Sequence, residues 1–342
     1  MKVGCVALIG RPNAGKSMLL NTLLGQKVAI ISDKPQTTRI SLLGIKTTKN
    51  GQIIFIDNPG IHKPLHTLNK RMMHFVYSSL ETSDLICLLI DATQPFGHGD
   101  EFVIETLKKV TTPLFLLINK VDIVKKEKIL LIIDKYKDML GFKEIIPISA
   151  LRGTNLDVLE NEIYKYLPEA EKLYDDDFVS DQSLRFRLAE IIREKLLKHV
   201  EQELPFVTAV LIEKMEERQK EEGEEKTEAA TEGPEVMTGP GAEAAVTATA
   251  ASEKAASPDS RPQKKKQQRK VTYISAIIFV ERDNHRKIVI GRHGQVIKEI
   301  GIEARREIEE ILESKVFLDL TVKVKEKWRD SAEVLDLIEG QK

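Results

Sequence analysis

Short apolar runs alternate with amphipathic stretches along the first half of the chain. The continuous apolar runs predict strands buried on both faces, and apolar positions at helical spacing predict helices between them. This alternation is typical of an α/β domain in which helices wrap a mostly parallel sheet, whose ligands bind at the carboxyl ends of the strands. The predicted strands are 53–56, 85–90, 114–118 and 145–148, and the predicted helices are 100–110, 126–140 and 155–167.

The second half of the chain has a different pattern. Apolar residues at helical spacing predict a helix over 184–200, with Ser183 as its N-cap. The remaining apolar runs add strands and one further helix, which together describe an α+β domain. These strands are predicted at 206–212, 271–281 and 316–324, and the helix at 302–312.

Changes of composition divide the chain. Residues 168–182 are acidic and lack a clear period, so we interpret them as a linker between domains at 1–167 and 183–342. Residues 216–270 contain no aromatic residue and almost no branched aliphatic residue, so we predict that they are disordered. Because strands are predicted on both sides of it, this insert is interpreted as an expanded loop inside the second domain.

Composition limits the partners and the compartment. The 342 residues carry a net charge of −1, so a nucleic acid or a membrane would need a local basic face. Cys5 and Cys87 lie in apolar runs, as expected for small buried residues in a reducing compartment. No apolar run has the length of a transmembrane helix, and the first strand begins almost at Met1, which leaves no presequence. We therefore expect a cytoplasmic protein.

The segment Gly10-Arg-Pro-Asn-Ala-Gly-Lys-Ser17 lies between an apolar run and an apolar-periodic stretch. The spacing G-x-x-x-x-G-K-S between strand and helix is that of a phosphate-binding loop, in which backbone N–H groups and a helix N-terminus face an anion. Lys16 is placed to reach the β- and γ-phosphates of a nucleotide, and the Ser17 hydroxyl is placed to bind Mg²⁺. The predicted phosphate-binding residues are Gly10, Asn13, Ala14, Gly15, Lys16 and Ser17.

Two later segments complete a triphosphate site. Asp57-Asn-Pro-Gly60 follows a predicted strand, where the Asp57 carboxylate can hold Mg²⁺ through water and the Gly60 N–H can contact a γ-phosphate. A threonine in the polar segment 33–39 can bind Mg²⁺ and the γ-phosphate, which would order this segment with GTP and loosen it with GDP. We assign this role to Thr38, with Thr37 as the alternative. The predicted metal ligands are thus Ser17, Thr38 and Asp57, and the predicted catalytic groups are Lys16, Thr38 and Gly60.

The segment Asn119-Lys-Val-Asp122 ends another predicted strand. The Asp122 carboxylate can accept hydrogen bonds from N1–H and the exocyclic amine of guanine, which adenine does not offer in that geometry, so an ATPase is disfavoured. Asn119 would fix the loop and the Lys120 stem would cover the purine. The dipeptide Ser149-Ala150 follows the next strand, where a backbone N–H can reach the guanine O6. The predicted base-binding residues are Asn119, Lys120, Asp122, Ser149 and Ala150.

A second motif, Gly291-Arg-His-Gly294, lies between the sequences I-V-I-G and V-I-K-E-I-G. In this context, and with the predicted order of strands and helices, it is the loop of a KH domain, which clamps the backbone of single-stranded nucleic acid. The glycines allow a phosphate to approach, and Arg292 and His293 add donors. A groove for bases would be lined by neighbouring apolar residues, some of which must belong to the core: Val289, Ile290, Val296, Ile297 and Ile300. The predicted RNA-binding residues are Gly291, Arg292, His293, Gly294 and Lys298.

These segments together resemble the Era family of bacterial GTPases. Met18 and Asn58 stand where threonine is common in that family, but neither change removes a ligand. The resemblance implies a P-loop GTPase domain followed by a type II KH domain, and it covers nearly all of the chain except the insert. The similar segments are GRPNAGKS, GQKVAIIS, DKPQTTR, DNPGIHKP, NKVD, SALRG, LRFRLAEIIREKLL, ELPFVTAVLIE, YISAIIFVER, IVIGRHGQVIKEIGIEAR and LDLTVKVKEKW.

Ile61 stands where Ras-like GTPases carry the glutamine that orients the attacking water. Isoleucine cannot form that hydrogen bond, and the resemblance to Era includes this substitution. We therefore expect GTP hydrolysis to GDP and phosphate to be slow. We also hypothesise that Asn13 helps to bind a monovalent cation, K⁺, beside the phosphates, as in related GTPases.

The resemblance implies a joint function for the two domains. GTP would favour the state that grips RNA, and hydrolysis would release it, with 16S ribosomal RNA of the 30S subunit as the target and subunit maturation as the role. The alternative is a GTPase whose C-terminal domain docks on a protein or a membrane, with G-x-x-G as a structural turn. The resemblance also implies peripheral association with the inner face of the cell membrane. We expect a monomer.

Two further features carry no predicted chemistry. His62, His66 and His74 lack the spacing of metal ligands and are interpreted as loop histidines. Trp328 follows the last predicted strand and is interpreted as a packing residue at the edge of a domain.

Overall fold

The predicted apolar strands of the first half lie side by side in one sheet. The computed structural model describes residues 1–219 and 270–342, and the strands of these residues form two sheets. The first sheet has the order β2-β3-β1-β4-β5-β6, and all of its neighbouring strands are parallel except β2 and β3. Its strands are β1 (Lys2–Gly10), β2 (Leu42–Thr48), β3 (Gly51–Asp57), β4 (Leu85–Asp91), β5 (Leu114–Asn119) and β6 (Phe142–Pro147).

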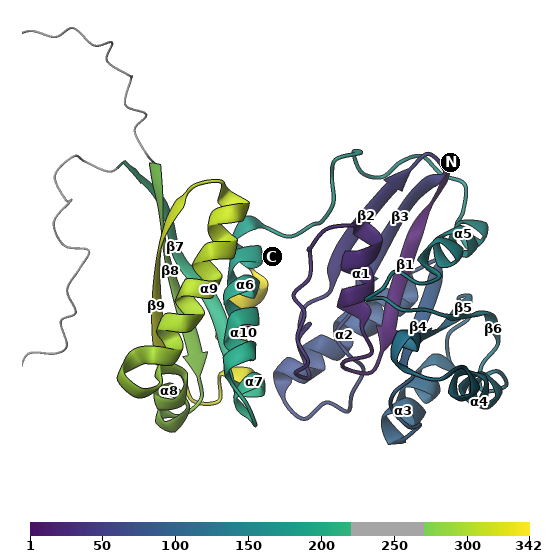
Figure 1. Ribbon diagram of the computed structural model, residues 1–342, viewed down its shortest axis with the longest axis horizontal. Coiled ribbons are helices and arrows are strands. Elements are labelled where there is room, and N and C mark those ends of the chain that lie inside the picture. The colour runs from purple at the N-terminus through teal and green to yellow at the C-terminus, as the bar shows by residue number, and fades with distance from the viewer. Residues whose placement is uncertain (220–269) are drawn as a thin grey trace, which may run out of the picture.

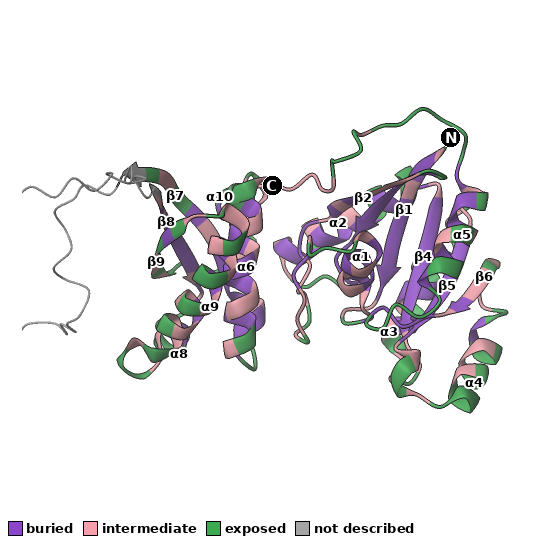
Figure 2. Cartoon of the chain, turned by 45° about the horizontal axis from the view of Figure 1, so that its top comes forward, coloured by how far each residue is buried: buried purple, intermediate pink, exposed green. Residues whose placement is uncertain are grey.

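Helices cover both faces of this sheet (Figure 1). Successive residues of a strand point to opposite faces, so Val6 and Leu8 of β1 join one core with α1 and α5, while Ala7 and Ile9 join the other with α2, α3 and α4. Both faces of the central strands are therefore buried, as their continuous apolar runs predict, and Figure 2 shows β1, β4 and β5 as largely buried. The edge strand β6 is mostly half-buried, so the predicted burial of 145–148 on both faces is only partly met. The helices are α1 (Lys16–Leu24), α2 (Thr67–Thr82), α3 (His98–Leu107), α4 (Lys126–Tyr136) and α5 (Leu156–Tyr166), with a short 3-10 helix η1 (Val121–Ile123).

β2 and α2 have no counterpart among the predicted elements. β2 is an edge strand with a mixed polar sequence, and its extended form comes from antiparallel pairing with β3. The buried residues of α2 include Leu68, Met72, Val76 and Leu80, which follow helical spacing, so the signal for this helix was present in the sequence.

The acidic segment 168–182 runs past the first sheet to the second domain without forming a helix or strand of its own, and it contains a turn in which Phe178 N–H donates to Asp175 O at 3.2 Å (Figure 1). Near its start, Val3 N–H donates to Pro168 O at 3.0 Å, and near its end Ile45 N–H donates to Val179 O at 2.8 Å. Isolated β-bridges join the same two places. The segment therefore connects two sheets, as a linker would, although the domain limits at 167 and 183 stay predictions.

The second sheet has the order β7-β8-β9, in which β7 and β8 are antiparallel and β8 and β9 are parallel. The order of elements along the chain, helix-strand-strand-helix-helix-strand, confirms the predicted α+β domain of type II KH topology. Ser183 Oγ accepts a hydrogen bond from Phe186 N–H at 3.1 Å, which confirms the predicted N-cap of α6. The strands are β7 (Ala209–Gln219), β8 (Lys270–Val280) and β9 (Lys315–Val324), and the helices are α6 (Leu184–His199), α7 (Leu204–Val207), α8 (Asp283–Ile290), η2 (Arg292–Gly294), α9 (Gln295–Leu312), η3 (Trp328–Asp330) and α10 (Ala332–Glu339).

Some predicted boundaries in this half are wrong. The strand predicted from Phe206 begins at Ala209, because Pro205 lies in the short helix α7. The helix predicted from Ile302 begins at Gln295, directly after the G-x-x-G motif. Each of these ends depends on packing that a local apolar pattern does not record.

The predicted insert 216–270 is too long at both ends. Residues 216–219 continue β7 and Lys270 begins β8, with Glu216 opposite Tyr273 in the antiparallel ladder. Pairing with an apolar neighbour thus extends a charged stretch into a strand. The rest of the predicted disorder, at 220–269, lies outside the described residues.

The two domains touch through α2 and the C-terminal elements. Leu68 and Met72 of α2 share a buried cluster with Trp328, Val334 and Leu335. The predicted packing role of Trp328 fits this position, since the ring is fully buried. Within the described residues, no helix has both the length and the apolar character needed to cross a bilayer.

Candidate nucleotide site, RNA loop and the contact between domains

A cavity of about 330 Å³ lies at the carboxyl ends of the strands of the first sheet. Residues from every predicted nucleotide-binding segment line it, although these segments are up to 137 residues apart, from Asn13 to Ala150. Four predicted residues, Gly10, Ala14, Asp57 and Ser149, are buried directly behind the lining. The predicted residues in the lining are Asn13, Gly15, Lys16, Ser17, Thr37, Thr38, Gly60, Asn119, Lys120, Asp122 and Ala150.

The phosphate loop connects β1 to α1. Gly15 has φ of 97°, and a Cβ at this position would collide with the side-chain amide of Asn119, so only glycine fits. Lys16 is the first residue of α1, and its Nζ donates to Arg11 O at 3.2 Å across the loop. Burial lowers the pKa of Lys16 to about 8, although the nearby Asp57 carboxylate acts in the opposite direction. The loop therefore holds the Lys16 ammonium against its own backbone carbonyl oxygens.

The three predicted metal ligands converge. Ser17 Oγ lies 2.6 Å from Asp57 Oδ2 and 2.9 Å from Thr38 Oγ1, and Thr38 Oγ1 lies 3.3 Å from Asp57 Oδ2. Asp57 Oδ1 is buried and has no hydrogen-bond partner among the described residues. Burial raises the pKa of Asp57, while Lys16 and the two hydroxyls lower it. A set of oxygen ligands with one unpaired carboxylate oxygen fits Mg²⁺.

The geometry separates the two candidate threonines. Thr37 Oγ1 donates to Lys34 O at 2.7 Å, so this hydroxyl is held within its own turn. Thr38 Oγ1 instead meets Ser17 and Asp57. This arrangement favours Thr38 over Thr37 as the predicted ligand.

Gly60 lies at the edge of the cavity, and the next residue turns away from it. Ile61 N–H donates to Gly10 O at 3.0 Å, and the Ile61 side chain is buried in the core with Met73 and Val76. His62 contacts the backbone here, since its Nδ1 lies 2.7 Å from Gly60 O. His62 lies in a loop, as predicted, although no spacing in the sequence indicates this contact, whereas His74 lies within α2 and its interpretation as a loop histidine is wrong.

The predicted base-binding segments form one network. Asn119 Nδ2 donates to Ala14 O at 2.8 Å, and Asn119 Oδ1 accepts from Ala150 N–H at 2.9 Å. Asn119 thus joins three loops, as its predicted fixing role requires. Asp122 Oδ1 accepts from Ser149 Oγ at 2.6 Å, which orients the carboxylate. Both backbone N–H groups of the dipeptide predicted to reach guanine are engaged, since that of Ser149 donates to Thr154 O at 3.3 Å and that of Ala150 donates to Asn119.

The G-x-x-G motif connects α8 to α9. Gly291 and Gly294 have φ of 76° and 73°, in the left-handed region that favours glycine. A Cβ at Gly291 would lie 2.5 Å from Val296 Cγ2, whereas one at Gly294 would meet open space. Among the described residues no hydrogen bond or ion pair engages the exposed side chains of three predicted RNA-binding residues, namely Arg292, His293 and Lys298.

Not all of the apolar residues near this loop line a groove. Val289 and Ile300 are fully buried in the core of the second domain. Ile290, Val296 and Ile297 are partly exposed beside the loop. Only these last three keep the surface that the prediction requires.

Comparison with known proteins shows to which family this chain belongs. A family model described as 50S ribosome-binding GTPase matches residues 5–120, and a KH domain model matches residues 262–329. GTPase Era of Halothermothrix orenii is 40% identical over 329 residues, which are 96% of this chain and 95% of that protein. The chain belongs to the Era family of GTPases.

Two solved Era structures have the same fold as this Era-family GTPase. One is Era in complex with MgGDPNP and nucleotides 1506–1542 of 16S ribosomal RNA, with a TM-score of 0.80 and 37% identity over 99% of this chain and 98% of that one. The other is a variant of Aquifex aeolicus Era bound to GDP·AlF4⁻, with a TM-score of 0.79 and 37% identity over 99% of both chains. GTP hydrolysis is accordingly the reaction of this chain, and guanine nucleotide and Mg²⁺ are its ligands.

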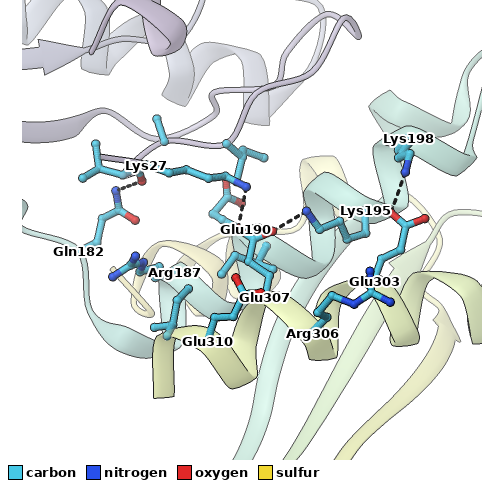
Figure 3. Close-up of a pocket in the computed structure, with 15 residues that line it drawn as sticks. Lys27, Gln182, Arg187, Glu190, Lys195, Lys198, Glu303, Arg306, Glu307 and Glu310 are labelled. Carbon is cyan, nitrogen blue, oxygen red and sulfur yellow. Dashed lines mark hydrogen bonds and ion pairs between the residues drawn. The ribbon is translucent and has the colours of Figure 1, made fainter. Parts of the chain in front are cut away.

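The Era-family GTPase has a second cavity, of about 700 Å³, between its two domains (Figure 3). Lys27 of the first domain reaches toward acidic side chains of α6 and α9, and its Nζ lies 2.6 Å from Glu194 Oε2 and 2.7 Å from Glu307 Oε1. Lys195 pairs with the same two glutamates. Ile31 N–H also donates to Glu194 Oε1 at 3.0 Å. The cavity is thus bordered by a network of ion pairs that ties α9 to the segment before Thr38.

Proposed function

We propose that this Era-family GTPase binds 16S ribosomal RNA through its KH domain and acts in maturation of the 30S ribosomal subunit. The observation that carries the proposal is the Gly291–Gly294 turn, which presents exposed basic side chains at the N-terminus of α9. Support comes from the Era structure of the same fold, which holds nucleotides 1506–1542 of 16S ribosomal RNA. Bound guanine nucleotide would control the grip on RNA, because the nucleotide cavity and the second domain share direct contacts.

The proposed roles in the nucleotide site follow the geometry. Lys16 holds the β- and γ-phosphates, and Ser17, Thr38 and Asp57 hold Mg²⁺, which when bound offsets negative charge on the phosphates. The backbone N–H of Gly60 contacts the γ-phosphate. The base-binding residues are Asn119, Lys120, Asp122, Ser149 and Ala150.

Hydrolysis is proposed to be slow and to depend on a monovalent cation. Ile61 is buried away from the cavity, so its side chain cannot orient the attacking water. Asn13 lines the cavity, and its Nδ2 donates to Asp33 O at 2.5 Å. We hypothesise that its remaining oxygen helps to bind K⁺, and equal hydrolysis rates in potassium and in sodium would contradict this hypothesis.

The RNA role is tested with Gly294→Asp in the full chain. Gly294 has open space around it, so the variant adds a negative charge at the loop without a steric clash. Its affinity for a 16S ribosomal RNA 3′ fragment is expected to fall by at least roughly tenfold, because like charges repel the phosphate backbone. Gly25→Asp is the matched control, since Gly25 also has positive φ (69°) and open space but lies in the first domain.

The same two variants distinguish RNA binding from the alternative function, in which the C-terminal domain docks on a protein or a membrane. GTP hydrolysis in the absence of RNA should stay unchanged in both. RNA affinity of Gly294→Asp equal to that of Gly25→Asp would overturn the proposal. Binding of the unmodified chain to anionic lipid vesicles, with no affinity for the RNA fragment, would instead favour docking on the inner face of the membrane. Cytoplasmic location, a monomeric state and the domain limits 1–167 and 183–342 are further proposals, which fractionation, sedimentation and limited proteolysis test.

A further inference from the structure

Three consecutive residues, Thr37, Thr38 and Arg39, connect the nucleotide cavity to the second domain. The Thr38 side chain points to Ser17 and Asp57. The residues on either side of it are held by groups of the second domain. The proposed magnesium ligand therefore lies between two anchors that the first domain does not supply.

Arg193 of α6 provides the first anchor. Its side chain is 3% exposed, and its Nη2 donates to the carbonyl oxygen of Thr37. The same guanidinium donates to both carboxylate oxygens of Glu190, from Nε at 2.7 Å and from Nη2 at 2.6 Å. This pair fixes the direction of the guanidinium, since a bidentate contact allows only one orientation.

Arg39 provides the second anchor, and here the arginine belongs to the first domain and its partners belong to the second. Its Nη1 donates to Thr208 O at 2.7 Å and its Nη2 donates to Pro205 O at 2.7 Å, both in or beside α7. Its guanidinium carbon lies 5.6 Å from the ring centroid of Trp328, which is close enough for a cation–π contact. Residue 39 is thus fixed to the second domain as firmly as residue 37.

The arrangement is costly for the fold. Arg39 Nε and Arg193 Nη1 are buried and have no hydrogen-bond partner among the described residues. Burial, together with the nearby charge of Arg193, lowers the pKa of Arg39 to about 9. Two buried cations with unpaired N–H groups do not maximise stability, because apolar residues of similar volume often serve as well. What they do achieve is a fixed backbone on both sides of Thr38.

We propose that Arg193 is a positioning residue for GTP hydrolysis, supplied by the second domain to hold Thr38 at the metal. Arg39 secures the same segment from the other side. The proposal rests on the assignment of Thr38 as a Mg²⁺ ligand. It implies that a change in the position of α6 relative to the first domain alters the rate of GTP hydrolysis through the Thr37 carbonyl. Binding of RNA to the second domain is one event that could move α6.

The test compares Arg193→Met with Arg185→Met in the full chain. Arg185 is an exposed residue of the same helix, so its variant controls for loss of a cation on α6. For Arg193→Met, kcat is expected to fall by roughly tenfold or more, since small displacements of a reacting group have such effects. The Mg²⁺ concentration for half-maximal rate should rise. GDP affinity should stay within about twofold, because Thr38 is proposed to act only with the γ-phosphate.

Two outcomes overturn the proposal. One is an Arg193→Met variant with the kcat and Mg²⁺ dependence of Arg185→Met. The other is a loss of kcat matched by an equal loss of GDP affinity, which would indicate general damage to the site. If Arg193→Met does not fold, Arg193→Lys is measured by the same criteria, because it keeps the charge but lacks the planar fork that bonds Thr37 and Glu190 together.

A third variant distinguishes this inference from the assignment on which it rests. Full activity of Thr38→Ala would remove Thr38 as the magnesium ligand. An inactive Thr38→Ala beside a fully active Arg193→Met would remove only the role of Arg193.

Discussion

Lys27 and Glu307 form an ion pair of 2.7 Å although 280 residues separate them in the chain. The Lys27 side chain is 39% exposed, so solvent screens the pair in part. We expect Lys27→Ala to lower the free energy of unfolding by up to about 1 kcal/mol at low salt. The difference from wild type should shrink at about 1 M salt, because the ions screen the pair.

Chemical denaturation at the two salt concentrations measures this effect. Lys108→Ala is the control, since Lys108 pairs with Glu105 on one exposed helix surface and should have no measurable effect. If Lys27→Ala lowers the free energy of unfolding equally at both salt concentrations, the Lys27 network stabilises the fold through packing rather than charge.

The lowered pKa of Lys16 predicts how nucleotide binding depends on pH. Above the folded pKa of about 8 the lysine loses its proton in the nucleotide-free chain, so a bound phosphate must restore it. GTP affinity should therefore fall by up to roughly tenfold per pH unit above 8. Isothermal titration between pH 7 and pH 9 measures the slope, and Lys16→Met should bind weakly with a flat profile.

The expected loss of GTP affinity above pH 8 cannot come from a loss of folding stability caused by Lys16. The folded pKa lies below the ordinary lysine value of 10.5, so between about 8 and 10.5 the unfolded chain binds more protons than the folded one. The contribution of this group to stability therefore rises with pH in that window. A GTP affinity that stays constant from pH 7 to pH 9 would contradict the predicted role of the buried charge.

Asp122→Asn should change the preferred base. The carboxylate is oriented by Ser149 and is proposed to accept two hydrogen bonds from guanine. An asparagine leaves one of them unpaired, so GTP affinity should fall by about a hundredfold or more while xanthosine triphosphate binds better. Competition with GDP, ADP and xanthosine diphosphate measures the preference, and a variant that still favours GDP would exclude Asp122 from the base site.

Asp57→Asn should remove most of the Mg²⁺-dependent activity. The asparagine can still contact Ser17, so the fold should be kept while the buried negative charge is lost. We expect kcat to fall by about a hundredfold or more. Magnesium titration of the hydrolysis rate checks this, with Asp134→Asn on the exposed face of α4 as the control. Equal rates for the two variants at every Mg²⁺ concentration would exclude Asp57 from the metal site.

Trp328→Ala should lower the free energy of unfolding. The ring is fully buried and its Nε1 donates to Val207 O at 2.8 Å, so the variant leaves a cavity and an unpaired carbonyl. The expected loss is about 3–5 kcal/mol in the free energy of unfolding. Phe317→Ala is the control, because that ring is 58% exposed and stacks on Tyr273, a contact worth only about 1 kcal/mol. Similar losses for both would contradict the packing role.

The sequence predicts those parts of the site whose chemistry is local. Gly10–Ser17 and Asn119–Asp122 each combine a strand end, a turn and the reactive side chains within eight residues, so pattern and function are visible together. The G-x-x-G motif is visible for the same reason. The α/β sheet and the KH topology follow from the apolar runs, although the starts of β7 and α9 and the elements β2 and α2 do not.

The contacts between the domains could not be predicted in this way. Arg39 bonds residues 166 and 169 positions away, and Arg193 bonds a carbonyl 156 positions away. Nothing in the local pattern around either arginine distinguishes it from a solvated charge. β7 likewise extends through Glu216 only because β8 pairs with it, which is a property of the assembled sheet.

The path of residues 168–182 has a consequence for how the two domains can move. Pro168 and Val179 are hydrogen-bonded to the first sheet, and Leu43 N–H donates to Asp181 at 3.0 Å, so most of this segment travels with the first domain. Ser183 is bonded to Lys342 in the second domain. The backbone between these two sets of bonds lies around Gln182. The second domain should therefore turn about this one point, at a fixed distance and a free angle, once its contacts with the first domain are released. These contacts are those of Lys27, Arg39 and Arg193, the ion pairs of Arg71 and Lys342, and the buried cluster of α2 with Trp328.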